Sequence, residues 1–196
     1  MKKQKNTSAI ILAGGKGTRI NGNKALLPVS GITIIEKIVN DIEPYFEEIL
    51  ISAQSRESFN FLPHRIVVDE ELNTGPLMGI LSGLRASKNA VNFVIACDIP
   101  EVNFDFLEKL NSYTDEYDIV VPVSGKNKFE PLFAFYNKNL IPKIEELLIQ
   151  KQKKISKLFL KCKTKYIPME NNGWYYNLNF MENYKKYLKN MNKNQV

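Results

Sequence analysis

Short apolar runs alternate with amphipathic stretches along almost the whole chain. An apolar run of about four to eight residues between polar turns is typical of a buried strand, whereas apolar residues about three or four positions apart are typical of a helix. Their alternation predicts an α/β fold in which helices cover both faces of a mostly parallel sheet. Because 196 residues can form one core, we expect a single three-layer α/β/α domain over 1–196, with its core at about 8–188 and short tails.

Three of the expected strands end beside polar residues. In a parallel α/β sheet, ligands bind in the crevice at the carboxyl ends of the strands. The strands expected at 9–12, 65–69 and 92–96 each end at glycine or aspartate, so we expect a site where these ends meet. The other expected strands are 48–53, 118–123, 132–136 and one near Tyr166, and the expected helices are 32–42, 76–86, 105–110, a lysine-rich stretch beyond Asn139 and a terminal helix after Asn179.

The composition is basic, with a formal net charge of +6. Such a chain can bind nucleic acid, a membrane surface or a small polyanion, although a lysine- and asparagine-rich composition that reflects genome bias gives the same net charge through its lysines, without any partner. We expect neither nucleic acid nor membrane, because the chain has no basic repeat flanked by aromatic residues and no apolar run of about eighteen residues. The apolar stretch 9–13 is too short for a signal peptide, so we expect a cytoplasmic protein.

A glycine-rich loop follows the first expected strand. Gly14, Gly15 and Gly17 lack a Cβ atom, so their backbone N–H groups can approach a phosphate closely. Arg19 and Lys24 add positive charge to the same loop. The dinucleotide fingerprint fails because an isoleucine stands where its third glycine belongs, and the P-loop fails because Lys24 is followed by alanine. The loop is therefore predicted to bind a triphosphate in another way.

Aspartates end the other two strands. Asp98 follows an apolar run, where an unpaired carboxylate would be costly to bury. A hard divalent cation that bridges triphosphate oxygens is a natural partner for it, and a helix cap or a salt bridge is the structural alternative. Asp69 repeats the arrangement at a second strand end, where a structural part is as compatible with the sequence as a ligand contact.

Two later segments carry further candidates. At Gly75, the start of an expected helix exposes N–H groups that can bind an anion, whereas Gly79 and Gly83 on that helix can serve close packing on the sheet as readily as ligand contact. Asn177 and Asn179 place two amides on one side of an extended segment, although Asn179 can equally cap the last helix.

These segments together resemble the molybdenum cofactor guanylyltransferases, of the wider glycosyltransferase-A-like (nucleotide-diphospho-sugar transferase) fold. The resemblance rests on LAGGKGTR with Lys24, TGPLMGILSGL, ACDIP, FEPLFAFY and a late NLN, and it runs from residue 10 to about 187. It implies transfer of GMP from GTP to the terminal phosphate of molybdopterin or its metal-loaded form, with release of pyrophosphate. It also implies Mg²⁺ as the cofactor, and GTP, the pterin and molybdoenzyme-maturation proteins as partners.

The resemblance extends to individual residues. We expect Lys24, Asp98 and Arg19 to be catalytic, with Lys24 on the phosphates and Asp98 as the ligand of the metal. The expected acceptor side is formed by Asn177 and Asn179, with Lys153 and Lys154 facing the pterin phosphate. The expected nucleotide-binding residues are Leu12, Ala13, Gly14, Gly15, Lys24, Asp69, Gly75 and Asp98.

The chain departs from the family pattern at two places. The family loop usually reads R-M-G-x-D-K, whereas this chain has Asn21 and Asn23 in place of the glycine and the aspartate. Asn21 tolerates the left-handed conformation better than most residues, so the turn can survive. The terminal N-x-N is followed by Phe180 and Met181 instead of Thr-Pro, a change that affects the acceptor side more than the nucleotide side.

Three alternative functions remain open at this point. The related cytidylyltransferases usually carry LAAG and CDQP, whereas this chain has LAGG and CDIP, which favours GTP. A sugar-phosphate nucleotidyltransferase shares the GG-x-G-T-R core, but Lys24 arrives too early for its pattern. A non-catalytic nucleotide-binding module does not need a metal carboxylate such as Asp98.

Overall fold

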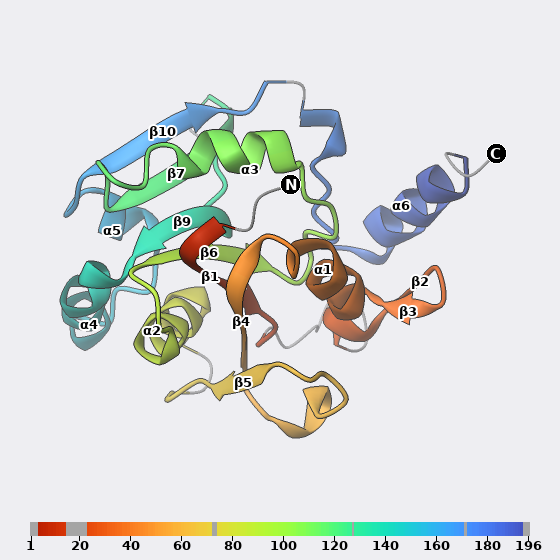
Figure 1. The fold of residues 1–196 in the computed structure, drawn as a ribbon, viewed down its shortest axis with the longest axis horizontal. Helices are drawn as coiled ribbons and strands as arrows, with labels where there is room; N and C mark the ends of the chain where they lie inside the picture. Colours follow the sequence, from red (N-terminus) through yellow and green to blue (C-terminus); the bar gives the residue numbers. More distant parts are fainter. Residues whose placement is uncertain (1–3, 15–22, 72–73, 127, 171, 194–196) are drawn as a thin grey trace.

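A computed structural model describes residues 4–14, 23–71, 74–126, 128–170 and 172–193 (Figure 1). One sheet has the strand order β10-β7-β9-β6-β1-β4-β5, and β8 pairs with β7 outside this path. Its strands are β1 (Gln4–Leu12), β4 (Phe46–Ala53), β5 (Arg65–Val68), β6 (Val91–Ala96), β7 (Ile119–Gly125), β8 (Lys128–Phe129), β9 (Phe133–Asn137) and β10 (Thr164–Pro168). The helices are α1 (Ile34–Ile42), α2 (Pro76–Ala86), α3 (Phe104–Asn111), α4 (Ile141–Ile149), α5 (Ser156–Phe159) and α6 (Met181–Lys193).

The sheet is mostly parallel, as the sequence predicts. β1 pairs in parallel with β4 and β6, β4 with β5, and β7 with β10. β9 is the exception on the main path, because it runs antiparallel to both β6 and β7. The carboxyl ends of β1, β5 and β6 therefore lie at one edge of the sheet.

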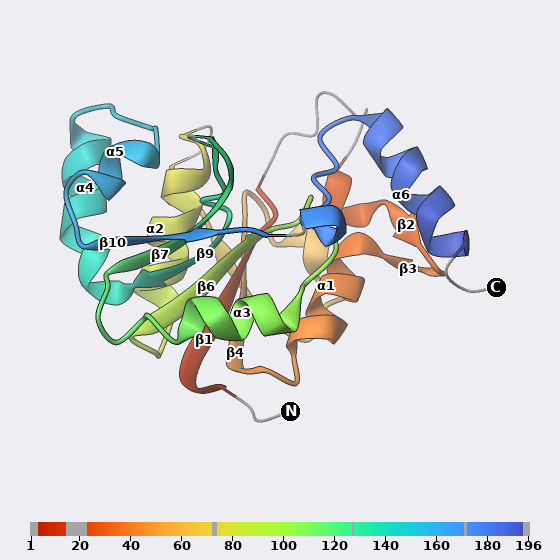
Figure 2. The same ribbon diagram turned by 90° about the horizontal axis from the view of Figure 1, so that it is seen from above.

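Helices cover both faces of the sheet, so the predicted three-layer α/β/α architecture is confirmed. Alternate residues of β1 enter different cores: Ala9 and Ile11 pack with α1, α3 and α6, and Ile10 and Leu12 pack with α2, α4 and α5. Figure 2 shows α2, α4 and α5 on one side of the sheet and α1 and α3 on the other. In the part of the chain that the structure describes, every helix is too short or too polar to cross a bilayer.

The helix expected at 32–42 begins two residues later, at Ile34. A short hairpin of β2 (Pro28–Val29) and β3 (Ile32–Thr33) precedes it. Thr33 then forms a capping box with Glu36, in which each side chain bonds to the other residue's backbone N–H. The hairpin also contacts α6, because the Tyr184 hydroxyl of that helix donates to the Pro28 carbonyl.

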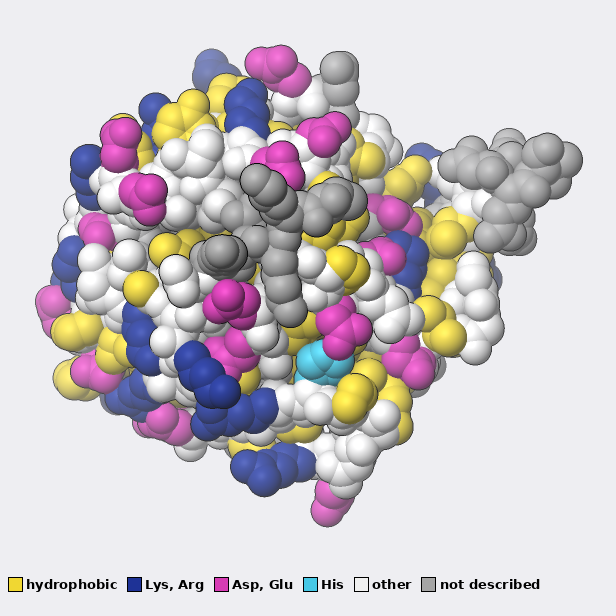
Figure 3. Space-filling model, viewed as in Figure 1, with side chains coloured by type: hydrophobic (Ala, Val, Ile, Leu, Met, Phe, Trp, Pro, Cys, Tyr) yellow, Lys and Arg dark blue, Asp and Glu magenta, His cyan; other side chains and the backbone are white. Residues whose placement is uncertain are grey.

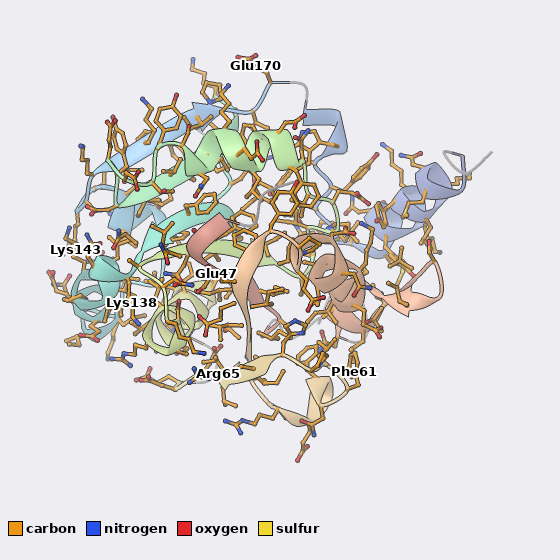
Figure 4. The ribbon with its side chains drawn as sticks, in the orientation of Figure 1. Glu47, Phe61, Arg65, Lys138, Lys143 and Glu170 are labelled. Carbon is orange, nitrogen blue, oxygen red and sulfur yellow. The ribbon has the colours of Figure 1, made fainter. Side chains whose placement is uncertain are left out.

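Helix α2 has the bounds that the sequence predicts. Gly75 precedes it with φ +92°, a left-handed conformation that favours glycine. Two cations bind the carboxyl end of α2: Arg65 donates to the Ala86 carbonyl and Lys138 to the Ser87 carbonyl. Both side chains are labelled in Figure 4. Cations at this end of a helix complement its dipole.

The surface charge is mixed. On the face seen in Figure 3, lysine and arginine side chains lie among aspartate and glutamate side chains.

Candidate active site

The ends of three parallel strands bring the expected site residues together. Leu12 at the end of β1 lies between Ser52 of β4 and Ala96 of β6 in the strand register. The hydrogen-bond ladders continue one residue beyond the strands: Ala13 N–H donates to Ser52 O, Asp69 N–H to Ala53 O and Cys97 N–H to Leu12 O, at 2.8, 3.0 and 3.0 Å. Backbone bonds therefore fix the positions from which Asp69 and Asp98 project.

Lys24, Asp98 and Asn179 meet at this edge of the sheet. Lys24 Nζ lies 3.3 Å from Asp98 Oδ2 and 3.1 Å from Asn179 Oδ1. The side chains of Lys24 and Asp98 are only 16% and 19% exposed, so each charge offsets the cost of burying the other. Asn23 caps the short helix that carries Lys24, because its side chain accepts a hydrogen bond from the Ala25 N–H at 3.1 Å.

Both structural alternatives for Asp98 can now be judged. It is not the cap of α3, because the Asn103 side chain caps that helix by accepting from the Phe106 N–H at 2.9 Å. Asp98 does form a salt bridge, but its partner is Lys24, which is itself an expected site residue. The salt bridge between Lys24 and Asp98 therefore brings a positive and a negative side chain together at the carboxyl ends of the central strands.

The segment 175–179 passes over Asp98 and Lys24. Leu178 N–H donates to the Asp98 carbonyl at 2.8 Å, which holds the segment over the strand end. Asn179 is not the cap of α6, because the helix begins at Met181 and the Asn183 side chain accepts from the Phe180 N–H at 3.1 Å. Asn177 also lies here, and its buried Oδ1 has no hydrogen-bond partner among the described residues. The site interpretation of Asn179 is thus favoured over the cap.

Asp69 lies beside the glycine loop. Its Oδ1 accepts a hydrogen bond from the Ser52 hydroxyl at 2.7 Å, and a Cβ atom on Gly14 would lie 3.2 Å from its Oδ2. Burial raises the pKa of Asp69, and the Ser52 hydrogen bond partly opposes that rise. A Cβ on Gly79 would lie 2.7 Å from the Ser52 hydroxyl oxygen and 3.7 Å from Asp69 Oδ1, so the packing of this glycine also shapes the surroundings of the carboxylate.

A second group of expected residues surrounds a hollow in the surface. It measures about 420 Å³, and Lys24, Asp98 and Asn179 are not among its lining residues. The start of α2 contributes Pro76, next to Gly75. The hollow is lined by Pro76, Lys128, Phe129, Pro131, Lys153, Lys154, Ile155, Ser156 and Phe159. The structure thus brings the two expected acceptor lysines together with aromatic side chains and a third lysine.

Comparison with known proteins decides the family. Residues 9–165 match the family described as the MobA-like NTP transferase domain. The chain is 35% identical to a protein of Carboxydothermus hydrogenoformans named probable molybdenum cofactor guanylyltransferase, over 94% of this chain and 96% of that relative. The chain belongs to the molybdenum cofactor guanylyltransferase family. A family member of Vibrio vulnificus, named molybdenum cofactor guanylyltransferase, is 34% identical over 90% of this chain and 92% of its own length.

A solved structure has the same fold as this chain. The molybdopterin-guanine dinucleotide biosynthesis protein A from Archaeoglobus fulgidus superposes with a TM-score of 0.82, covering 95% of this chain and 99% of its own. At 22% identity this likeness concerns the fold alone. The predicted nucleotidyltransferase fold is confirmed.

Two of the expected site residues lie outside the residues that the structure describes, and the sequence did not indicate one residue that contacts the site. Gly15 and Arg19 fall outside the described residues, so their expected roles stay predictions. Sequence analysis did not single out Ser52, which the structure places on Asp69. The available signal was a small hydroxyl residue near the carboxyl end of an otherwise apolar strand, FEEILISA.

Replacing Asp69 by asparagine is expected to stabilise the fold at neutral pH. Because burial raises the pKa of Asp69 in the folded chain, its ionised form opposes folding above the pKa of the unfolded chain, and this cost disappears at lower pH, where the carboxyl is protonated in both states. Asp69→Asn should therefore increase the free energy of unfolding at about pH 8, with a gain that shrinks towards about pH 4. Urea unfolding at both pH values measures it, with the exposed Asp115→Asn as control. Lower stability of Asp69→Asn at about pH 8 would contradict this account.

Proposed function

We propose that this chain transfers GMP from GTP to the terminal phosphate of molybdopterin or its metal-loaded form and releases pyrophosphate. The observation that carries the proposal is the meeting of Lys24, Asp98 and Asn179 at the carboxyl ends of the central strands. Curated relatives that match at 34–35% identity over at least 90% of this chain are named for guanylyl transfer to the molybdenum cofactor, which supports the same assignment.

The reaction needs positioning and charge neutralisation more than it needs a protein nucleophile. An oxygen of the acceptor phosphate attacks the α-phosphorus of GTP, a new P–O bond forms, and the bond to the β-phosphate oxygen breaks so that pyrophosphate leaves. The Lys24 ammonium has three N–H donors, and two of them are directed to Asp98 and Asn179. The third can be donated to a phosphate oxygen, which places Lys24 on the charge that develops during transfer.

The residues present fit a magnesium ion that arrives with the triphosphate. Mg²⁺ is usually held by one or two carboxylates together with substrate phosphates. Asp98 offers one partly exposed carboxylate, and the described residues contain no group of three or more His, Cys, Asp or Glu side chains that would form an all-protein site. When bound, the ion would supply positive charge to the phosphate oxygens.

Nucleotide and acceptor are proposed to occupy neighbouring parts of one edge. The backbone at Leu12, Ala13 and Gly14 lies beside Asp69, where a guanine nucleotide can approach closely because Gly14 has no side chain. The hollow lined by Lys153 and Lys154 suits the acceptor, because its aromatic side chains can pack against a pterin ring and its lysines can attract a phosphate. Asn177 and Asn179 lie on the remaining side of the site.

The assignment is tested with a nucleotide panel. Purified protein with Mg²⁺, GTP and molybdopterin should release pyrophosphate, and CTP should support a rate at least about tenfold lower, because a pocket that hydrogen-bonds one base leaves its polar groups unpaired with the other. Omission of Mg²⁺ or of molybdopterin is the matched control. Equal rates with CTP, turnover only with a sugar phosphate, or GTP binding without turnover would each overturn the proposal in favour of one of the three alternatives.

A further inference from the structure

Glu130 is a buried carboxylate that lies outside the proposed catalytic residues. The residue is only 8% exposed, and it precedes β9. Its Oε1 accepts a hydrogen bond from the Ser124 hydroxyl at 2.5 Å, and its Oε2 accepts one from the Tyr175 hydroxyl at 2.9 Å. The largely exposed Lys128 is 3.6 Å from Oε1. Burying a carboxylate is costly unless hydrogen bonds replace water, and here two hydroxyl groups do so.

The Tyr175 hydroxyl connects this carboxylate to the site. Burial raises the pKa of Tyr175, and the charge of Glu130 raises it further, so the hydroxyl stays protonated and donates. The Tyr175 ring packs edge-on against Phe133 of β9 and against Trp174, with centroids 6.2 and 5.7 Å apart. Tyr175 is therefore fixed both by its ring and by its hydroxyl.

Tyr175 begins the segment that crosses Asp98 and Lys24. Residues 175–179 form neither helix nor strand, so they lack the regular ladder of bonds that would order them. Ordering such a backbone costs conformational entropy, which contacts with the rest of the molecule must offset. Hydrogen bonds join the segment to the rest of the molecule at both ends: Tyr175–Glu130 at one end, and Leu178–Asp98 and Asn179–Lys24 at the other. Between them, the Tyr176 hydroxyl accepts from the Asn190 amide, and the Leu178 side chain is buried in the core.

We propose that Glu130 is a positioning residue, which holds segment 175–179 over Asp98 and Lys24 through the Tyr175 hydroxyl. The proposal deepens the proposed function and rests on it for the identity of the acceptor. Glu130 acts through Tyr175, so its part is to present Asn177 and Asn179 in a fixed place. Glu130 precedes β9, whereas Gly14 and Asp69 follow β1 and β5, which lie beyond β6 in the strand order. Loss of the Tyr175–Glu130 bond should therefore weaken use of the acceptor more than use of GTP.

Tyr175→Phe tests this directly, because it removes the hydroxyl and keeps the ring. The KM for molybdopterin should rise about tenfold, as expected when a hydrogen bond to a charged group is lost, while the KM for GTP stays within about twofold. Glu130→Gln keeps an oxygen that can accept from Tyr175, so it should retain more acceptor affinity than Glu130→Ala. Tyr184→Phe is the matched control: it removes a tyrosine hydroxyl outside segment 175–179, one that donates to the Pro28 carbonyl, and both KM values should stay at wild type.

A second measurement needs no substrate. Trp174 is the only tryptophan of the chain and adjoins Tyr175, so its fluorescence reports on the position of the segment. Tyr175→Phe should make Trp174 more accessible to acrylamide quenching, and Tyr184→Phe should not. If wild type fails to use molybdopterin but the quenching differs as expected, the proposed function fails and the positioning part stands. If Tyr175→Phe leaves quenching unchanged, or raises both KM values equally, the positioning proposal is overturned.

Discussion

Asp98→Asn is expected to lower kcat for GMP transfer by about two to three orders of magnitude. The substitution keeps the shape of the side chain and an oxygen that can accept from Lys24, but it removes the negative charge that pairs with the Lys24 ammonium and that the proposed Mg²⁺ ion would need. Removing one preorganised charge-stabilising group typically costs a factor of about 10²–10³ in kcat. Pyrophosphate release at saturating GTP, measured across a Mg²⁺ series, checks the size of the loss. Lys24→Ala should reduce kcat by a similar factor, because it removes the cation that we propose neutralises the phosphates.

The control for this pair is Lys161→Met. It also removes a lysine from an ion pair, but this lysine follows α5 and its partner is Glu146 of α4, at 2.6 Å, so wild-type activity is expected. Urea unfolding of all three variants separates lost catalysis from lost fold. If Asp98→Asn unfolds most of the protein while the soluble remainder keeps wild-type specific activity, Asp98 has a structural part and the catalytic assignment is wrong.

Gly83→Val is expected to destabilise the fold by about 3 kcal/mol or more. A Cβ atom on Gly83 would lie 2.6 Å from Ile10 Cγ2 and 2.8 Å from its Cδ1, well inside van der Waals contact. Ile10 is completely buried in the central strand β1, so it cannot yield without displacing the core. Overpacking a well-filled core costs typically about 1–3 kcal/mol, and valine adds two methyl groups beyond the Cβ. Equilibrium unfolding in urea measures the change in the free energy of unfolding.

A double-mutant cycle shows whether the Ile10 contact causes this loss. Gly83→Ala alone should destabilise, although alanine is the better helix former by about 1 kcal/mol. Combined with Ile10→Val, which removes one methyl group at the point of contact, Gly83→Ala should cost less than in the wild-type background. Additive effects of the two substitutions would show that the strain lies elsewhere.

The sequence predicts elements better than it predicts their directions. The bounds of α2 follow from Gly75 and Pro76 at its start and from the end of the apolar pattern at Ala86. The antiparallel direction of β9 does not follow, because FAFYN alternates between the two cores in the same way whichever end comes first. The hairpin of β2 and β3 was missed because strands of two residues carry no periodicity.

The members of the site could be predicted, but not their contacts. Motif and strand-end reasoning selects Lys24 and Asp98 separately, yet they are 74 positions apart and nothing local indicates their ion pair. The sequence alone left Asn179 open between a helix cap and a site residue, because it did not show where the last helix begins. The three-dimensional structure shows that α6 begins at Met181 and that Asn179 accepts a hydrogen bond from Lys24.

The crossing segment also sets the order in which this enzyme is completed during its synthesis. The bond between Lys24 and Asn179 joins residues 155 positions apart, whereas the last strand of the described sheet ends at Pro168. A nascent chain can therefore complete its sheet, with the ends of β1, β5 and β6 in place, before Asn179 has left the ribosome. Contacts between such distant positions form late because a long loop must close first. Under the proposed function, the nucleotide side of the sheet edge is therefore expected to be complete before the side that carries Asn179.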